Sequence, residues 1–492
     1  MQMNELIGGL DSIVTLRSPA AAIDISGLTA DSRHVRPGFL FAALPGSKAD
    51  GRDFISAALA QGASAILSPE NQPILDLPPH VAHVTAANPR RALALLAARF
   101  NGAQPKTIAA VTGTSGKTST TVFTRQLWSL LGHRAASLGT IGLTAPGYEL
   151  PDSLTTPDPV ELHRILAELA FKNIDHLAME ASSHGLDQYR LDGVQVTAAA
   201  FTNLSRDHLD YHGNMQAYLQ AKLRLFADLL PAGGTAVVNA DMEVAEDVFA
   251  VSRRAHHRLI AVGAKGSDIR LIKQTPTSTG QMLEIDLFGT RHDIEFPVAG
   301  LFQAYNLLTA MGLVIGSGGE PAVVAQLVGR LTGVHGRIEH VATTPSGGAV
   351  YVDYAHKPGA LEAVLTALRP HTTGKLAVVI GCGGDRDRGK RPIMGEIATR
   401  LADRVIVTDD NPRSEDPAAI RAEICAAAPG AIEIGDRAEA IRHAMRELGK
   451  GDVLIIAGKG HETYQIVGNV KHDFDDSQVA RDVALALESE AS

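Results

Sequence analysis

A short glycine-turned segment carries the clearest chemistry in this chain. Residues 112–118 read TGTSGKT and follow the apolar run Ile108–Val111. The two glycines let backbone N–H groups approach phosphate oxygens, Lys117 can reach the outer phosphates, and the Thr118 hydroxyl is placed to bind Mg²⁺. Val111 stands where the common phosphate loop has glycine, so this is the shorter TGTxGKT variant. A strand, this loop and a helix opening at Lys117 predict a nucleotide-phosphate site.

Further polar groups follow apolar runs downstream. Glu180 ends one such run, and a carboxylate emerging near the phosphate loop is a candidate Mg²⁺ ligand. A second run, ending at Thr202, precedes a polar cluster made of Asn203, Arg206, Asp207, His208, Asp210 and His212. For His208 the residues alone are equally compatible with a solvated turn.

Lys222 interrupts an apolar helical stripe formed by Tyr218, Leu225 and Leu229. Snorkelling of the ammonium group to solvent is the usual explanation, and the residues alone favour it. Desolvation is the alternative: it would lower the lysine pKa and leave a neutral amine able to react with CO₂ to give a carbamate.

Three charged loops near the C-terminus each follow a predicted strand. They read GCGGDRDRGKR from Gly381, DDNPRSEDP from Asp409 and GKGHE from Gly458. In a doubly wound sheet such loops share the carboxyl edge, where these folds bind ligands. Each loop alone could be an ordinary turn rich in Gly, Asp and Pro, but three charged loops together favour a single ligand-binding crevice.

Alternating strand and helix patterns predict an α/β protein that positions these groups. We expect three domains: an N-terminal domain over 1–103, a central P-loop-type ATP-binding domain over 104–334, and a C-terminal Rossmann-like doubly wound domain over 335–492. The predicted strands are Phe39–Leu44, Ala65–Leu67, Leu177–Glu180, Ala198–Thr202, Thr235–Asn239, Leu376–Ile380, Arg404–Thr408, Ile432–Ile434 and Val453–Ala457, with early helices from Asp53 and over Pro89–Phe100.

Composition narrows the class of protein. The 492 residues carry a net charge of −9 and 4% aromatic residues, which argues against nucleic-acid binding. No uninterrupted apolar stretch reaches about 18 residues, and no basic region with an apolar core opens the chain, so we expect no membrane insertion. Two cysteines suit a reducing compartment, and the cytoplasm is the expected location.

Taken together, the motifs resemble those of the Mur ligases, the ATP-dependent amide-bond-forming enzymes of peptidoglycan precursor synthesis. The resemblance covers nearly the whole chain and also rests on TTPD (155–158), MEASSHGLDQYR (179–190), TNLSRDHLDYHG (202–213), AYLQAKLRLF around Lys222, HGRIE (335–339) and VDYAHKP (352–358). The DNPR motif at 410–413 resembles the signature of one branch of the family. That branch adds meso-diaminopimelate, rather than L-lysine, to UDP-N-acetylmuramoyl-L-alanyl-D-glutamate.

The resemblance implies roles at the ATP end. It assigns catalytic roles to Lys117, Glu180, His208 and Lys222. Mg²⁺ would be held by Thr118, Glu180, His208 and a CO₂-derived carbamate on Lys222 (N6-carboxylysine). A carbamate at Lys222 requires a desolvated amine, so the resemblance reverses the preference for snorkelling. ATP contacts fall to Gly113, Thr114, Ser115, Gly116, Lys117, Thr118, Ser119, Asn306, Arg337 and Asp353. The implied chemistry is phosphoryl transfer to the D-glutamate γ-carboxylate, followed by amine attack on the acyl phosphate.

It also implies two substrate sites. The UDP-substrate would contact Ser32, Ser47, Lys48, Ala49, Thr155, Thr156, Ser182, Gln188 and Arg190. Diaminopimelate would contact Arg386, Asp410, Asn411, Pro412, Arg413, Gly458 and Glu462. A monomer making transient contacts with other precursor-synthesis enzymes fits this role.

Two positions depart from the family pattern: Gln303 and Leu154 stand where relatives carry asparagine. Three alternatives stay open. They are an L-lysine-adding Mur ligase, an enzyme like folylpolyglutamate synthetase, and a nucleotide-binding regulator without ligase activity. Intact Lys117, Glu180, His208 and Lys222 argue against the regulator.

Overall fold

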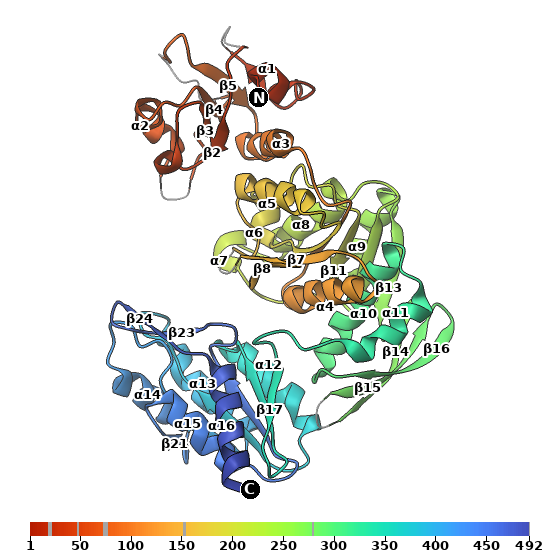
Figure 1. Cartoon of the computed structure of the whole chain (residues 1–492), viewed down its shortest axis with the longest axis vertical. Coiled ribbons are helices and arrows are strands. Elements are labelled where there is room, and N and C mark those ends of the chain that lie inside the picture. Colours follow the sequence, from red (N-terminus) through yellow and green to blue (C-terminus); the bar gives the residue numbers. More distant parts are fainter. Residues whose placement is uncertain (18–21, 47–48, 72–76, 151–153, 278–279, 492) are drawn as a thin grey trace. The chain divides into compact units, whose positions relative to one another are not determined.

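The computed structural model describes residues 1–17, 22–46, 49–71, 77–150, 154–277 and 280–491 (Figure 1). It divides into two compact units, Met1–Ile260 with Gly312–Gly318, and Ala261–Met311 with Gly319–Ser492. Parallel sheets covered by helices confirm the expected α/β class. The domain boundaries near 103 and 334 stay a prediction.

The first unit opens with a five-stranded sheet in the order β1-β5-β4-β3-β2, parallel except at β1. Its elements are α1 (Met3–Ile7), β1 (Thr15–Leu16), β2 (Gly27–Thr29), β3 (Phe39–Ala42), α2 (Ile55–Ala60), β4 (Ala65–Pro69), β5 (Ala82–Ala86) and α3 (Pro89–Asn101). Asn88 caps α3 by accepting from the Arg91 amide, and Pro89 occupies its first turn, as expected for a helix start.

The second sheet of this unit runs β12-β11-β6-β10-β7-β8-β9. Its strands are β6 (Thr107–Thr112), β7 (Ala135–Gly139), β8 (Gly142–Ala145), β9 (Tyr148–Leu150), β10 (His176–Glu180), β11 (Ala198–Phe201) and β12 (Thr235–Asn239). The five strands from β12 to β7 are parallel and almost wholly buried, because helices flank them, which explains their apolar sequences.

The helices of this part are α4 (Lys117–Leu130), α5 (Pro159–Phe171), α6 (Ser183–Asp187), α7 (Leu209–His212), α8 (Met215–Arg224) and α9 (Ala245–Arg254). A π-helical turn, Leu225–Leu229, extends α8. No helix among the described residues is long and apolar enough to cross a membrane.

The second unit begins with an antiparallel meander that the sequence did not lead us to expect. It consists of β14 (Ile269–Pro276), β15 (Gln281–Leu287) and β16 (Thr290–Phe296), preceded by β13 (Arg258–Gly263). β15 alternates buried with more exposed residues, the pattern of a strand with one covered face. α10 (Leu301–Gly316) and α11 (Pro321–Leu327) follow.

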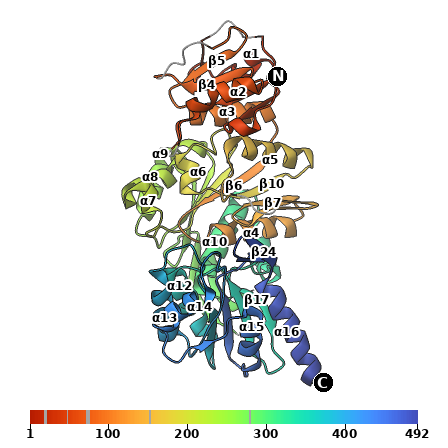
Figure 2. The same ribbon diagram turned by 90° about the vertical axis from the view of Figure 1, so that its left-hand side faces the viewer.

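The C-terminal sheet runs β17-β18-β22-β19-β20-β21 and is parallel except at β17, so the expected doubly wound sheet is confirmed. Its elements are β17 (Glu339–Thr343), β18 (Ala349–Asp353), α12 (Pro358–Leu368), β19 (Leu376–Ile380), α13 (Lys390–Leu401), β20 (Arg404–Val407), α14 (Pro417–Cys425), β21 (Ile432–Glu433), α15 (Arg437–Arg446), β22 (Val453–Ala457) and α16 (Asp476–Ala491), with a hairpin of β23 (Tyr464–Val467) and β24 (Val470–Asp473). α16 packs beside β17 (Figure 2).

Candidate active site

The phosphate loop between β6 and α4 adopts a conformation that needs its glycines. Gly113 has φ 142° and Gly116 has φ 85°, and a Cβ on Gly113 would collide with the Thr202 hydroxyl. The loop leaving β11 holds it in place, because Asn203 accepts from the Thr114 amide through its carbonyl and from the Ser115 amide through its side chain, both at 2.9 Å. The backbone is thus preorganised for an anion.

Lys117 opens α4 and folds back over this loop. Its Nζ donates to the carbonyl oxygens of Gly113 at 3.0 Å and Thr114 at 2.9 Å. This position beside the loop suits a lysine that contacts phosphate as a point charge.

Glu180, at the carboxyl end of β10, is 1% exposed, and its carboxylate accepts three hydrogen bonds. It accepts from the Thr118 hydroxyl at 2.9 Å, from the Thr140 amide at 2.9 Å and from the Thr140 hydroxyl at 3.3 Å. A carboxylate joined to the hydroxyl that ends a phosphate loop is an all-oxygen donor set that fits Mg²⁺. No sequence motif singles out Thr140, and its position just after β7, which pairs with β10, is the signal that the sequence offers.

Lys222 on α8 is 1% exposed, so the snorkelling favoured by the residues alone is wrong. Its Nζ donates to the Gly113 carbonyl at 2.8 Å and lies 4.4 Å from the centre of the Tyr218 ring. Burial, and next the charge of Lys117, lower the pKa of Lys222 to about 6. A largely neutral amine therefore touches the phosphate loop at neutral pH.

His208 lies in a cluster of aromatic side chains. Its φ is 51°, its ring centre is 4.8 Å from that of His184, and it lies 6.4 Å from the ring of Tyr218, over which the Lys222 nitrogen sits. Its side chain is partly exposed and lies 3.5 Å from Asp207. This left-handed turn thus presents an imidazole close to the same tyrosine that covers Lys222.

Several residues expected at the UDP-substrate surround Glu180. Thr156 donates its hydroxyl to the Glu180 carbonyl at 2.9 Å and accepts from the Ser182 amide at 3.0 Å. Thr155 bonds Thr140 at 3.0 Å through its hydroxyl. Arg190 joins this group to Gln188, because its guanidinium donates to the Thr156 carbonyl and to the Gln188 side chain, both at 2.7 Å.

The other expected UDP contacts lie in the N-terminal sheet region. Ser32 starts a 3₁₀ turn, and its carbonyl accepts from Gln61 at 3.0 Å. Ser47 and Lys48 lie outside the described residues, next to Ala49. Leu154, which departs from the family pattern, is 63% exposed, so it replaces a polar group at the surface rather than in a core.

In the second unit, Asn306, Arg337 and Asp353 belong to one connected group. Asn306 donates to Gln303 at 2.9 Å, and Gln303 donates to the Arg337 carbonyl at 3.4 Å. Gln303, which departs from the family pattern, therefore connects Asn306 to Arg337. Asp353 accepts from the Ile338 amide at 2.8 Å, and burial raises its pKa to about 6. The Arg337 Nε is buried without a hydrogen-bond partner among the described residues, which leaves a donor for an anionic ligand.

The three C-terminal loops meet around a cavity of about 690 Å³ at the carboxyl edge of the sheet. It contains both signs of charge, as a ligand with amino and carboxylate groups requires. Its lining comprises Tyr354, His356, Lys357, Pro358, Gly383, Arg386, Asp387, Gly389, Lys390, Ile393, Asp410, Asn411, Arg413, Gly458 and Glu462. Of the residues expected to bind diaminopimelate, all except Pro412 are in this lining.

Lys459, within GKGHE, is fully buried behind this lining and joins its polar groups. Its Nζ lies 2.6 Å from the Tyr464 carbonyl, 3.1 Å from the Asn411 Oδ1 and 3.4 Å from the Asp410 Oδ1. Glu462 accepts from Asn411 at 3.1 Å, and burial, and next the charge of Asp410, raise its pKa. The sequence placed Lys459 in a motif but gave it no role.

Arg413 lines the cavity and connects its loop to the β23–β24 hairpin. Its Nη1 donates to the Gly384 carbonyl at 2.9 Å, its amide donates to the Ile466 carbonyl at 3.1 Å, and its carbonyl accepts from the Gly468 amide at 2.8 Å. The φ of Arg413 is 52°, unusual for a residue with a side chain. The hairpin therefore holds the DNPR loop in a strained conformation.

A buried ion pair that no motif indicated supports these loops from below. Arg437 and Asp476 are both buried and form two hydrogen bonds of 2.7 Å, and Arg437 also donates to the Ala457 carbonyl at 3.1 Å. These residues begin α15 and α16, so they link two helices to the end of β22.

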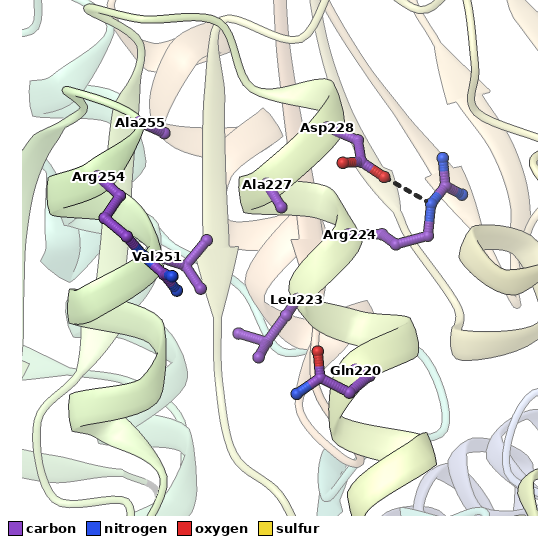
Figure 3. A pocket seen from close by; sticks show the side chains of 8 residues that line it. All are labelled: Gln220, Leu223, Arg224, Ala227, Asp228, Val251, Arg254 and Ala255. Carbon is purple, nitrogen blue, oxygen red and sulfur yellow. Dashed lines mark hydrogen bonds and ion pairs between the residues drawn. The ribbon is translucent and has the colours of Figure 1, made fainter.

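A separate cavity of about 560 Å³ lies in the first unit, among α8, the π-helical turn and α9 (Figure 3). Arg224 there bonds Asp228 at 2.9 Å and Asp192 at 3.0 Å, so its charge is already paired. None of the residues expected at the active site lines this cavity.

Family models match most of the chain. The Mur ligase middle domain matches residues 111–314, the Mur ligase glutamate ligase domain matches 336–460, and the catalytic domain of the Mur ligase family matches 24–101.

Curated relatives extend the similarity to the full length. A protein of Caulobacter vibrioides is 54% identical over 459 residues, which cover 92% of this chain and 94% of the relative. One of Bradyrhizobium diazoefficiens is 52% identical, covering 99% of both chains. Each is named UDP-N-acetylmuramoyl-L-alanyl-D-glutamate--2,6-diaminopimelate ligase.

Solved structures agree. A structure with that name aligns with a TM-score of 0.75 and 33% identity over 99% of both chains. A Mycobacterium tuberculosis folylpolyglutamate synthase complexed with ADP and AMPPCP aligns with a TM-score of 0.60 and 20% identity, covering 76% of this chain and 92% of its own. The second similarity concerns the fold alone.

Proposed function

This chain belongs to the Mur ligase family, and from that premise we propose that it joins meso-diaminopimelate to UDP-N-acetylmuramoyl-L-alanyl-D-glutamate in peptidoglycan precursor synthesis. The reaction uses ATP and releases ADP and phosphate. The observation that carries the amino-acid assignment is the mixed-charge cavity lined by Arg386, Arg413, Asp410 and Glu462.

The phosphate loop supports the ATP half of the proposal. The γ-phosphoryl group would pass to the D-glutamate γ-carboxylate, and the amine of diaminopimelate would attack the resulting acyl phosphate. Lys117 and the loop amides would contact the phosphoryl oxygens on which negative charge develops, and would stabilise transfer electrostatically.

Mg²⁺ would be held by Thr118 and Glu180, with His208 and a carbamate on Lys222 as further ligands, and it would supply charge neutralisation to the phosphates. The fit rests on the 2.9 Å hydrogen bond between Thr118 and Glu180 and on the buried Lys222 amine at the Gly113 carbonyl. Carbamate formation consumes a neutral amine, and burial favours that form.

Selectivity for diaminopimelate over L-lysine is proposed to come from Arg413. Diaminopimelate has a second amino-acid end whose carboxylate can pair with a guanidinium, whereas lysine has only an amine there. With lysine bound, the arginine would be left unpaired in a desolvated pocket, which penalises binding. Asp410 and Glu462 would accept hydrogen bonds from the distal amine.

The other functions fit less well. A folylpolyglutamate-synthetase-like activity does not explain the DNPR loop or the cavity behind it. A regulator without ligase activity does not need the buried Lys222, Glu180 and Thr118 arrangement. The cytoplasm, a monomeric state and transient contacts with neighbouring enzymes stay part of the proposal.

The test measures phosphate release from ATP with the UDP-muramoyl dipeptide and either meso-diaminopimelate, L-lysine or no amino acid, with product masses determined. Release and tripeptide formation only with diaminopimelate would support the full proposal. Equal use of lysine would keep the ligase and reject the role of Arg413, and the absence of product with both would reject the proposal.

A further inference from the structure

The amino end of β10 carries a group of metal-ligating side chains away from the proposed active site. His133, Asp175 and His176 each offer a nitrogen or oxygen atom, and the three atoms lie within 4.8 Å of one another. We propose that these residues bind a divalent transition metal ion of the Zn²⁺ type, which clamps the end of α4 to β10.

The backbone of this cluster is fixed on both sides. The Arg134 carbonyl accepts from the Asp175 amide at 3.1 Å and from the His176 amide at 3.3 Å. His133 closes the end of α4 by donating its amide to the carbonyl of the buried Trp128 at 3.0 Å. The two segments that carry the ligands are therefore held together before any metal binds.

The ligand set suits Zn²⁺ and related ions. Two imidazoles and one carboxylate leave a fourth, solvent-facing position for water. The His176 Nδ1 lies 2.9 Å from the Asp175 Oδ1, and the rings of His133 and His176 are 4.0 Å apart at their centres with a 31° tilt. Tetrahedral Zn²⁺ needs ligand atoms about 3.4 Å apart, and the exposed His133 ring can rotate to reach that arrangement.

The electrostatic surroundings also favour a cation. Both α4 and α5 end at this edge of the sheet, where helix C-termini carry partial negative charge. Two cations of the same segments make contacts of their own: Arg134 donates to the carbonyls of Asn173 and Lys172, and the Lys172 ammonium lies 4.9 Å from the centre of the Tyr148 ring.

The position of the cluster connects it to the phosphate loop through two rigid elements. α4 starts with Lys117 and packs on β10, which ends at Glu180 (Figure 2). His176 and Glu180 are the first and last residues of one strand, about 13 Å apart at the usual rise. A metal at the amino end would therefore restrain the two elements that carry the proposed Mg²⁺ ligands.

The experiment titrates Zn²⁺ into chelator-treated, full-length protein in millimolar Mg²⁺, with a chromophoric chelator as competitor. The parent is expected to bind one equivalent more than His133→Gln, and Asp175→Asn is expected to bind that equivalent at least tenfold more weakly. His80→Gln changes an exposed histidine outside the cluster and should match the parent.

Two further readouts do not depend on catalysis. Zn²⁺ should raise the thermal unfolding midpoint of the parent but not that of His133→Gln, because a ligand stabilises only the state that binds it. Co²⁺ should give the intense visible absorption of a tetrahedral site in the parent only. Equal Zn²⁺ stoichiometry in the parent and His133→Gln, or no tightly held Zn²⁺ in the parent, would overturn the proposal.

Discussion

Lys222 in the first unit and Lys459 in the second are both buried, yet their surroundings differ in charge. Lys222 touches one backbone carbonyl, lies over Tyr218 and has Lys117 as a neighbouring cation. Lys459 lies among Asp410, Asn411 and Glu462. Burial lowers the pKa of both. Only the charge of Asp207 opposes the shift at Lys222, whereas three carboxylates, those of Asp410, Glu462 and Asp476, oppose it at Lys459.

The difference teaches how one residue type serves two chemistries. A buried lysine that forms no ion pair loses its proton more readily, and the neutral amine is a nucleophile toward CO₂. A buried lysine between carboxylates stays cationic and orders the acceptors around it. On the proposed function, the phosphate loop would use its lysine as a reactant, and the mixed-charge cavity would use its lysine to hold the surrounding acceptors in place.

The strongest test of this comparison replaces Lys222 with methionine. We expect ligation to fall by about 10³-fold, or about 4 kcal/mol, because the proposed carbamate ligand can no longer form. Phosphate release measures the effect. With ¹³C-labelled bicarbonate, the parent should show one carbamate signal that Lys222→Met lacks.

The matched control is Lys106→Met, which removes an exposed lysine and should leave both readouts unchanged. A carbamate signal that persists in Lys222→Met would show that the two buried lysines do not differ as we describe. So would near-parental ligation by that variant.

Arg413→Ala tests the cavity. The ratio of kcat/KM for diaminopimelate over lysine should fall by about 10²-fold, since a charge-assisted pair contributes about 1.5–3 kcal/mol. Arg388→Ala removes an arginine paired with Glu423 outside the cavity lining and should keep the ratio. An unchanged ratio in Arg413→Ala would locate selectivity elsewhere.

The same contrast between lone and paired groups applies to two histidines. Burial lowers the pKa of His163 to about 4, whereas a hydrogen bond to Glu339 raises that of His335. The unfolded chain protonates His163 near pH 6.5, so the stability that this residue contributes is lost as pH falls from about 6.5 towards 4. The contribution of His335 is present at low pH and is lost as pH rises above about 6.5.

We therefore expect the parent to lose about 2 kcal/mol more than His163→Gln between pH 7.5 and 4.5, measured by urea unfolding. Glutamine can still donate to the Asp192 carbonyl that His163 contacts at 3.0 Å. Parallel pH dependences of parent and variant would contradict a neutral buried His163.

The smallest expected effect is that of Lys459→Met. Without the cation, Asp410 and Glu462 repel each other, and KM for diaminopimelate should rise about tenfold, or about 1.4 kcal/mol, while KM for ATP stays constant. Lys459→Arg should recover part of the loss. Lys450→Met, which removes an exposed lysine outside the cavity lining, is the control. A change in kcat alone would argue against a positioning role.

The phosphate site could be predicted from the sequence, because one contiguous loop supplies most of its residues. Strands β6, β10, β11 and β12 were also predicted from the sequence, since fully buried strands show as apolar runs, whereas β7, β8 and β9 were not. The meander β14–β16 was missed, because its alternation is interrupted by a register shift between Leu271 and Lys273.

Contacts between residues far apart in the chain could not be predicted from the sequence. Thr140 reaches Glu180 across 40 positions, and Arg437 meets Asp476 across 39. The burial of Lys222 depends on how α8 packs against the phosphate loop, a tertiary property that helical periodicity does not contain. A periodic stripe alone therefore favoured snorkelling, which was wrong.

The attachment of the β23–β24 hairpin to Arg413 bears on how amino-acid choice can be exchanged between family members. The DNPR loop owes its left-handed turn at Arg413 to hydrogen bonds with Ile466 and Gly468, more than fifty positions later. Grafting only the four residues of DNPR would transfer the side chains without the hairpin that holds the loop in its conformation. A working chimera therefore has to exchange the loop and the β23–β24 hairpin together.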